Sequence, residues 1–286
     1  MVIPTSEKKL KRTLGLALGG GGARGLVHIG VLKVLESENI KVDYLAGTSM
    51  GGIIAAAYAS GMSVAEIEEN ALHLARGREL MKLIDPSGLR RGLLEGRRVH
   101  AYLSRLLGED RTFADLHLPL ALNAVDLTLA KEVVFTEGPL LPAILASSAV
   151  PGLFPPQSIG GYRLIDGGVL NNVPVSLARQ LGAEVILAVD PSLDPAHNLP
   201  WQDLPEKPRW PVSLPDFFLD FYRAGLMMVE EITHKRMQED RPDIYLCPPM
   251  APDITMFLGF PRAAEIIAVG EEATREVVQE LKQLLE

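Results

Sequence analysis

The chain has 286 residues and a net charge of −8, with 47% hydrophobic and 22% charged residues, a composition typical of a globular protein. Its length fits one large α/β domain, with or without a modest extension. The lack of a basic block argues against nucleic acid as a partner, the single cysteine excludes an intramolecular disulfide, and no apolar run is long enough to predict a membrane span.

Residues 1–12 form a basic tail that precedes the apolar run Leu14-Gly15-Leu16-Ala17-Leu18. This order imitates a signal peptide, but the apolar run is too short, and four glycines followed by Arg24 end it. A buried first strand that stops at glycine explains the run better. We therefore expect a cytoplasmic protein.

Apolar periodicity and turn residues predict strands that alternate with helices. The predicted strands are 13–18, 42–47, 118–126, 131–135, 162–165 and 184–189. The predicted helices are 24–39, 51–60, one that begins at the capping box Ser63-Val64-Ala65-Glu66, 99–107, 142–148, 174–181, 216–239 and 261–286. The stretches 76–98 and 149–159 are predicted to be mainly loop.

This alternation predicts an α/β fold with a mainly parallel central sheet and helices on both faces. Residues 13–190 are expected to form the core of the fold. Residues 191–215 contain seven prolines with Trp201 and Trp210, and are predicted to be a lid or linker. Residues 216–286 are predicted to be a C-terminal helical part that packs on the same domain.

The segment Gly47-Thr48-Ser49-Met50-Gly51 is a G-x-S-x-G pattern between a predicted strand and a predicted helix. In this setting it predicts a nucleophile elbow, a sharp turn that exposes the serine hydroxyl above the sheet. Gly47 and Gly51 flank the serine because side chains there would collide with neighbouring backbone. The alternative is that Ser49 only caps a helix in a glycine-rich turn.

A second glycine-rich turn, Gly19-Gly20-Gly21-Gly22-Ala23-Arg24-Gly25, also joins a strand to a helix. Its backbone N–H groups and the helix dipole suit the oxyanion of ester hydrolysis. The turn also contains G-x-G-x-x-G, so a dinucleotide site is a rival hypothesis. Against this rival, Asp43, the acid that would hold the ribose, falls at the start of the second strand rather than at its carboxyl end.

A third motif, Asp166-Gly167-Gly168, follows the predicted strand 162–165. We expect Asp166 at the same edge of the sheet as Ser49, where it can accept the serine proton directly. The alternative is a carboxylate that only stabilises its own turn, as Asp-Gly sequences often do.

The three motifs occur in the order and context found in patatin-like phospholipases, and the chain resembles that family from Thr13 to Pro191. Two more blocks resemble the family, one running from Ala146 to Pro156 and the other being Asn171-Asn172-Val173-Pro174. The chain looks closest to compact bacterial members, which are similar to the catalytic domain of neuropathy-target-esterase-type enzymes. The remainder, up to Glu286, carries no such motif.

The resemblance implies an α/β lipid acyl hydrolase that cleaves phospholipids or lysophospholipids through a Ser–Asp dyad and an acyl-enzyme. Ser49 would be the nucleophile, Asp166 the base, and the backbone of Gly20–Gly22 the oxyanion hole. Arg24 stands in the family's Arg/Lys position and is expected to help hold that loop, the alternative being a weak surface salt bridge. The resemblance implies no cofactor and no metal.

A Ser-His-Asp triad is the alternative mechanism. His28 is expected to pack under the glycine loop. His197 falls in the proline-rich stretch and His234 in a charged helix, contexts that match a triad histidine poorly. Histidines and Cys247 lack metal-ligand spacing, so no metal site is predicted.

Three other functions stay open beside the lipid hydrolase. They are a soluble esterase or thioesterase with the same dyad, a nucleotide-binding protein that uses the glycine loop, and a silent scaffold. The presence of both Ser49 and Asp166 argues against the scaffold.

Contact with lipid is expected to be peripheral, through 191–215 or through the apolar stretch 216–228. The same stretch could instead be covered by the core or by a second subunit of a homodimer. Because the net charge disfavours attraction to anionic lipid, binding is expected to depend on apolar burial and to resist salt.

Overall fold

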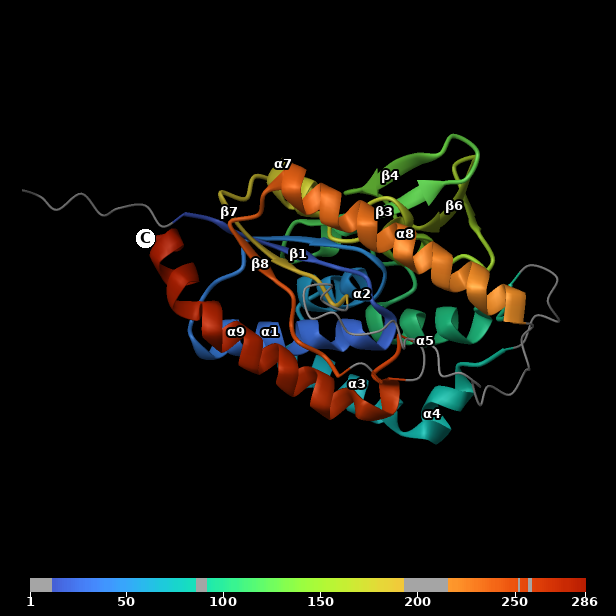
Figure 1. Ribbon diagram of the computed structural model, residues 1–286, viewed down its shortest axis with the longest axis horizontal. Coiled ribbons are helices and arrows are strands. Elements are labelled where there is room, and N and C mark those ends of the chain that lie inside the picture. Colours follow the sequence, from blue (N-terminus) through green and yellow to red (C-terminus); the bar gives the residue numbers. More distant parts are fainter. Residues whose placement is uncertain (1–11, 86–91, 193–215, 252, 257–258) are drawn as a thin grey trace, which may run out of the picture.

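The computed structural model describes residues 12–85, 92–192, 216–251, 253–256 and 259–286. The strands are β1 (Leu14–Leu18), β2 (Tyr44–Gly47), β3 (Leu120–Asp126), β4 (Lys131–Phe135), β5 (Gln157–Ile159), β6 (Tyr162–Asp166), β7 (Val185–Val189) and β8 (Ile244–Leu246). The α-helices are α1 (Val27–Ser37), α2 (Ser49–Ala59), α3 (Val64–Ala75), α4 (Gly77–Lys82), α5 (Arg97–Leu107), α6 (Leu140–Ser147), α7 (Val175–Leu181), α8 (Asp216–Asp240) and α9 (Ala263–Leu285) (Figure 1). Short 3-10 helices include η1 (Gly22–Leu26) and η3 (Gly167–Val169).

The strands form one eight-stranded sheet in the order β5-β6-β3-β2-β1-β7-β8, with β4 paired to β3. The neighbours from β3 through β8 are parallel, which confirms the predicted fold class. β4, β5 and β6 are antiparallel additions. β4 and β6 pair with the carboxyl-terminal half of β3, and β5 pairs with β6. That half of β3 continues beyond the end of β2, because Gly47, the last residue of β2, lies opposite Leu122. This extension rises past the carboxyl edge of the parallel strands.

The two faces of the sheet differ in side-chain size. On one face, leucines and valines of the central strands form the main core with α1, α2 and α9. On the other face, alanines of β1, β2, β3 and β7 leave room for α7 to lie close to the sheet. Figure 1 shows α1, α3 and α9 on one side and α7 and α8 on the other. Successive side chains of a strand point to opposite faces of the sheet, so the alternation of large and small residues along each strand explains both helix layers.

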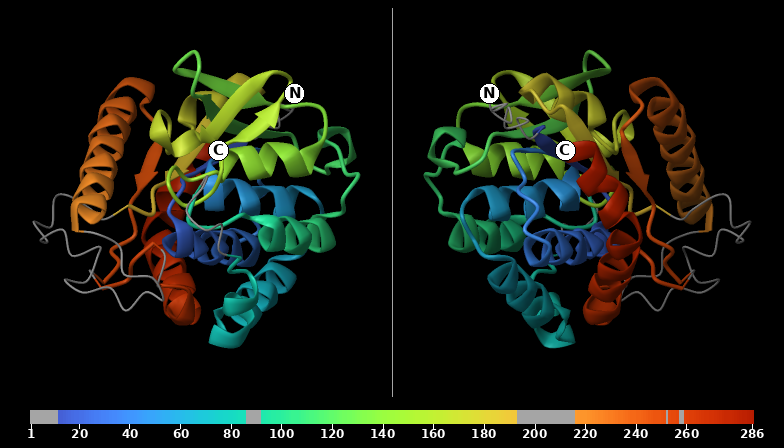
Figure 2. Two further views of the ribbon diagram at one scale, coloured as in Figure 1. Left: turned by 90° about the vertical axis from the view of Figure 1, so that its right-hand side faces the viewer. Right: turned by 90° about the vertical axis from the view of Figure 1, so that its left-hand side faces the viewer.

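The C-terminal part is built into the same sheet. β8 pairs in parallel with β7, and α9 packs along α1. The sequence analysis assigned only helices here, because a three-residue strand is too short to show a period. The helix α8 lies farther out, on the α7 side, and stands at one flank of the molecule in Figure 2.

Two elements fall in stretches predicted to be loop. α4 has six residues and β5 has three, so neither carries a recognisable period. The other predicted elements are present with small shifts of their ends, and the capping box at Ser63 and Glu66 is formed. Of the predicted lid or linker 191–215, residues 193–215 lie outside the described residues, as do Trp201 and Trp210. No described helix is long and apolar enough to cross a bilayer.

Candidate active site

Ser49 is the first residue of α2 and follows β2 after a single residue. Its backbone is left-handed, with φ of 52°, a strained conformation for a residue with a side chain that is typical of functional turns. A Cβ at Gly51 would lie 2.2 Å from the Leu18 carbonyl oxygen, and a Cβ at Gly47 would lie 2.6 Å from the Gly52 Cα. The predicted strand–turn–helix geometry is therefore present, and glycine is required on both sides of the serine.

Asp166 ends β6, and its carboxylate lies close enough to the Ser49 hydroxyl for the serine to stabilise its charged form. The structure thus brings the two residues together. β6 runs antiparallel to β3, with Asp166 opposite Ala124, so it returns from the part of β3 that extends beyond β2. An antiparallel strand therefore carries the carboxylate to the elbow in a sheet that is otherwise mainly parallel.

The Asp166 carboxylate is buried, with 6% of its surface exposed. Burial raises its pKa to about 6, against the lowering effects of the nearby Ser49 hydroxyl and of the hydrogen bond from the Gly168 N–H. The Gly168 bond is 2.8 Å long, so the carboxylate also stabilises its own turn. A carboxylate with this pKa is suited to accept a proton near neutral pH.

The glycine loop lies directly beside Ser49, since a Cβ at Gly20 would be 3.1 Å from the Ser49 Cβ. The Gly20 N–H donates to the Asn172 carbonyl, and the Asn172 side-chain amide donates to the Gly20 carbonyl, both at 3.1 Å. Among the described residues, the N–H groups of Gly21 and Gly22 have no acceptor. Of the three glycines expected to form the oxyanion hole, the last two therefore present unoccupied donors.

Arg24 and His28 hold the glycine loop from below. Arg24 is buried rather than at the surface, and its Nε donates to the Ile254 carbonyl at 2.8 Å. The His28 Nε2 lies 2.7 Å from the Gly19 carbonyl oxygen and must carry the hydrogen, because a carbonyl only accepts. Burial lowers the pKa of His28 to about 4, so the ring is neutral near pH 7.

No histidine of the described residues completes a triad by a hydrogen bond to Asp166. His28 bonds to Gly19, as its expected place under the loop implied. His234 lies on α8 and contacts Gln238. His197 lies outside the described residues.

Four polar side chains to which the sequence patterns gave no role support the elbow. The Ser147 hydroxyl accepts from the Ser49 N–H at 3.0 Å. Thr48 donates to Asn123 at 2.8 Å, and Asn123 in turn donates to Glu132 at 2.9 Å. The available signal was Asn123 itself, a polar residue in the middle of an otherwise apolar strand. Such a residue indicates a buried hydrogen bond.

A cavity of about 420 Å³ opens beside Ser49. Apolar side chains dominate its lining, which includes Met50 and Ile53 of α2, Ile67 of α3 and Tyr102 of α5. The composition of this cavity suits an apolar ligand group next to the serine hydroxyl.

Asp43, the acid required by the dinucleotide hypothesis, lies at the opposite end of the strands. Its carboxylate accepts from the Leu14 N–H at 3.0 Å, at the start of β1, whereas the glycine loop follows the end of β1. This separation argues against ribose binding by Asp43. No cluster of potential metal ligands occurs among the described residues.

A model of the patatin-like phospholipase family matches residues 16–179. The chain belongs to the patatin-like phospholipase family. Patatin-like phospholipase domain-containing protein 6 of Homo sapiens is 35% identical over 182 residues, which are 62% of this chain and 13% of that protein. A patatin-like phospholipase domain-containing protein of Caenorhabditis elegans is 30% identical over 94% of this chain and 21% of its own length. An uncharacterised NTE family protein of Mycobacterium tuberculosis is 35% identical over 62% of this chain and 48% of its own.

This patatin-like chain therefore spans from about an eighth to about half of the length of these relatives. Among solved structures, VipD from Legionella pneumophila aligns with a TM-score of 0.60 at 15% identity, covering 97% of this chain and 72% of that one. At this identity the likeness shows a shared fold.

Proposed function

We propose that this chain is a serine acyl hydrolase that cleaves ester bonds of phospholipids or lysophospholipids through the Ser49–Asp166 pair. The observation that carries the proposal is the position of the Ser49 hydroxyl between the buried Asp166 carboxylate and an apolar cavity. A nucleophile in contact with a base and a cavity for an acyl chain suit a lipid ester.

In the first step, the Ser49 Oγ attacks the ester carbonyl carbon while its proton passes to Asp166. The carbonyl oxygen becomes an oxyanion, and the N–H groups of Gly21 and Gly22 are placed to donate to it, each worth roughly 3 kcal/mol in the transition state. The bond to the alcohol then breaks, and the alcohol takes the proton from Asp166. Ser49 is left acylated.

In the second step, water replaces the alcohol. Asp166, ionised again, takes a proton from the water, which attacks the acyl carbonyl and releases a fatty acid from Ser49. The proton returns to the Ser49 oxygen as it leaves. A base whose pKa burial raises to about 6 is ionised at neutral pH yet basic enough for both transfers.

The apolar lining of the cavity favours a long acyl chain over the small substrates of a soluble esterase or thioesterase. Arg24 and Asn172 are both buried beside the glycine loop, which favours a role for both in holding that loop in place. The position of Asp43 disfavours the nucleotide-binding alternative.

A fluorophosphonate probe tests the proposal, because only an activated serine reacts with it. We expect labelling of the wild type and none of Ser49→Ala, together with a loss of turnover of roughly 10⁴-fold or more. Phospholipids, lysophospholipids and short p-nitrophenyl esters should be compared as substrates. Residual turnover above about a tenth of wild type in Ser49→Ala would assign the nucleophile elsewhere.

A further inference from the structure

We infer that the rim of the cavity, formed by residues 76–85 and 92–98, is a docking surface for membranes that contain anionic phospholipid. The inference rests on the proposed lipid hydrolysis and assigns the surface through which the site meets its substrate. Basic charge and the apolar cavity wall coincide in this one segment.

The charge of the segment is opposite to that of the chain. Residues 76–85 and 92–98 contain five Lys or Arg and three Asp or Glu, a net charge of +2, so the rest of the chain carries −10 of the total of −8. Arg76, Arg78 and Lys82 are exposed on or beside α4, and no described carboxylate pairs with the first two. Basic side chains are therefore concentrated at the outer surface of α4.

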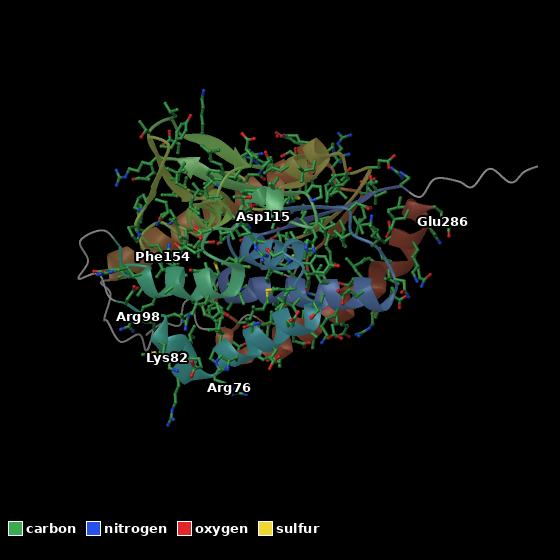
Figure 3. The ribbon with its side chains drawn as sticks, turned by 180° about the vertical axis from the view of Figure 1, so that it is seen from behind. Arg76, Lys82, Arg98, Asp115, Phe154 and Glu286 are labelled. Carbon is green, nitrogen blue, oxygen red and sulfur yellow. The ribbon has the colours of Figure 1, made fainter. Side chains whose placement is uncertain are left out.

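The start of α5 extends the same basic surface. The Arg98 guanidinium donates to the carbonyls of Lys82 at 3.4 Å and Ile84 at 2.9 Å, which holds the start of α5 against the end of α4. Figure 3 shows Arg76, Lys82 and Arg98 at one end of the molecule, with Phe154 nearby. The basic side chains thus gather in space as well as in sequence.

The inner face of the segment forms a wall of the apolar cavity. Leu80, Leu83 and Ile84 line it at helical spacing, and Met81 is 56% exposed. The lining passes from buried Ile29 on α1 to these partly exposed side chains. The cavity therefore opens beside α4, where the basic side chains stand.

A basic rim around an apolar opening fits an anionic bilayer surface. Arg and Lys contact the lipid phosphates, while Met81 and the cavity mouth meet the acyl region. An acidic protein partner would satisfy the charges but would leave the apolar opening without an occupant. The net charge of the chain led to the opposite expectation, that lipid binding resists salt. Net charge averages over the whole surface, whereas electrostatic attraction to a membrane acts only within a Debye length of about 8–10 Å. The local charge of the rim therefore determines how binding responds to salt.

The test is co-sedimentation of the full chain with vesicles of phosphatidylcholine alone or mixed with phosphatidylglycerol, at low and high salt. The variant Arg76→Gln/Arg78→Gln/Lys82→Gln removes three charges from the rim. The control Lys131→Gln/Arg163→Gln/Lys235→Gln removes three exposed charges from β4, β6 and α8. Melting temperatures establish that each variant is folded.

We expect binding to require the anionic lipid, to weaken at high salt, and to fall on the order of 100-fold in the rim variant, at about fivefold per basic side chain. The control should bind as wild type. The single variant Arg78→Glu reverses one exposed charge on the rim. It should weaken vesicle binding more than Lys131→Glu, which reverses an exposed charge away from the rim. Equal binding to both vesicles, no binding to either, or an equal loss in rim and control variants would overturn the inference.

Ser49→Ala separates docking from chemistry. It should dock as wild type although it cannot hydrolyse ester. Docking without any hydrolysis by wild type would refute the proposed function and leave the docking surface standing. Hydrolysis of soluble ester without rim-dependent docking would refute the docking surface and leave the acyl hydrolase activity standing.

Discussion

Replacing Asp166 by asparagine should remove activity while making the fold more stable. Asparagine keeps the shape and an oxygen that can accept from the Gly168 N–H, but it cannot take the Ser49 proton. Because general-base catalysis contributes about 10²–10⁴-fold, we expect kcat to fall by roughly 10³-fold with KM little changed. The double variant with Ser49→Ala should be little worse than either single variant, since the pair acts as a unit.

The gain in stability follows from the pKa of Asp166, which burial raises from 3.8 to about 6. A shift of this size corresponds to about 3 kcal/mol. Because the folded state favours the protonated acid, the contribution is present below pH 3.8 and is lost as pH rises through about 6. Asp166→Asn should therefore increase the free energy of unfolding by up to about 3 kcal/mol at pH 8, and hardly at all at pH 4.

Two measurements check this reasoning. The kcat/KM of the wild type for a soluble p-nitrophenyl ester should rise with pH through about 6 and then level off, because the base must be ionised. The melting temperature of Asp166→Asn should exceed that of wild type by up to about 6 °C at pH 8, at roughly 2 °C per kcal/mol for a chain of this size.

His28 affects stability with the opposite sign, since burial lowers its pKa from 6.5 to about 4 and its contribution is lost as pH falls through that range. Both proteins contain His28, so their difference at each pH isolates Asp166. An Asp166→Asn protein that keeps more than about a tenth of wild-type turnover would refute the assignment of the base. So would one that melts earlier than wild type at both pH values.

The remaining predictions concern the glycine loop. Gly21→Ala should lower kcat by about 10²–10³-fold with a smaller change in KM, because a new Cβ would lie 2.6 Å from the Pro191 ring and displace an oxyanion donor. Steady-state kinetics check this against Gly225→Ala, where the space is open; an equal effect in both would refute it. His28→Asn should retain substantial turnover and lose about 1–3 kcal/mol of stability in a denaturant titration, because its bond goes to Gly19. A His28 variant as inactive as Ser49→Ala would convert the dyad into a triad.

The parallel core was predictable because its elements are long enough to show their period. β1 and β7 read as apolar runs, and glycine or proline marks their ends. α4, β5 and β8 were missed because three to six residues show no period. In addition, β8 pairs with β7, which is distant in sequence, so its position depends on the tertiary structure rather than on local propensity.

The candidate site was predictable where the local backbone geometry requires glycine. Gly47 and Gly51 mark the elbow because no side chain fits there. The supporting side chains were not predictable, because Ser147 reaches the Ser49 N–H across 98 positions and Asn172 reaches Gly20 across 152. No local pattern distinguishes a serine or asparagine with such a bond from one in an ordinary turn.

The direction of β6 offers a physical reason why two residues suffice for the proposed chemistry. In a Ser-His-Asp triad, a histidine bridges the gap between the acid and the serine. Here the sheet extends past the end of β2, and β6 returns antiparallel from that extension, so the backbone carries Asp166 down to the level of Ala124, beside the elbow. The acid reaches the Ser49 hydroxyl directly, and burial raises its pKa toward that of a histidine. One buried carboxylate can thus combine the position and the basicity that the triad divides between two residues.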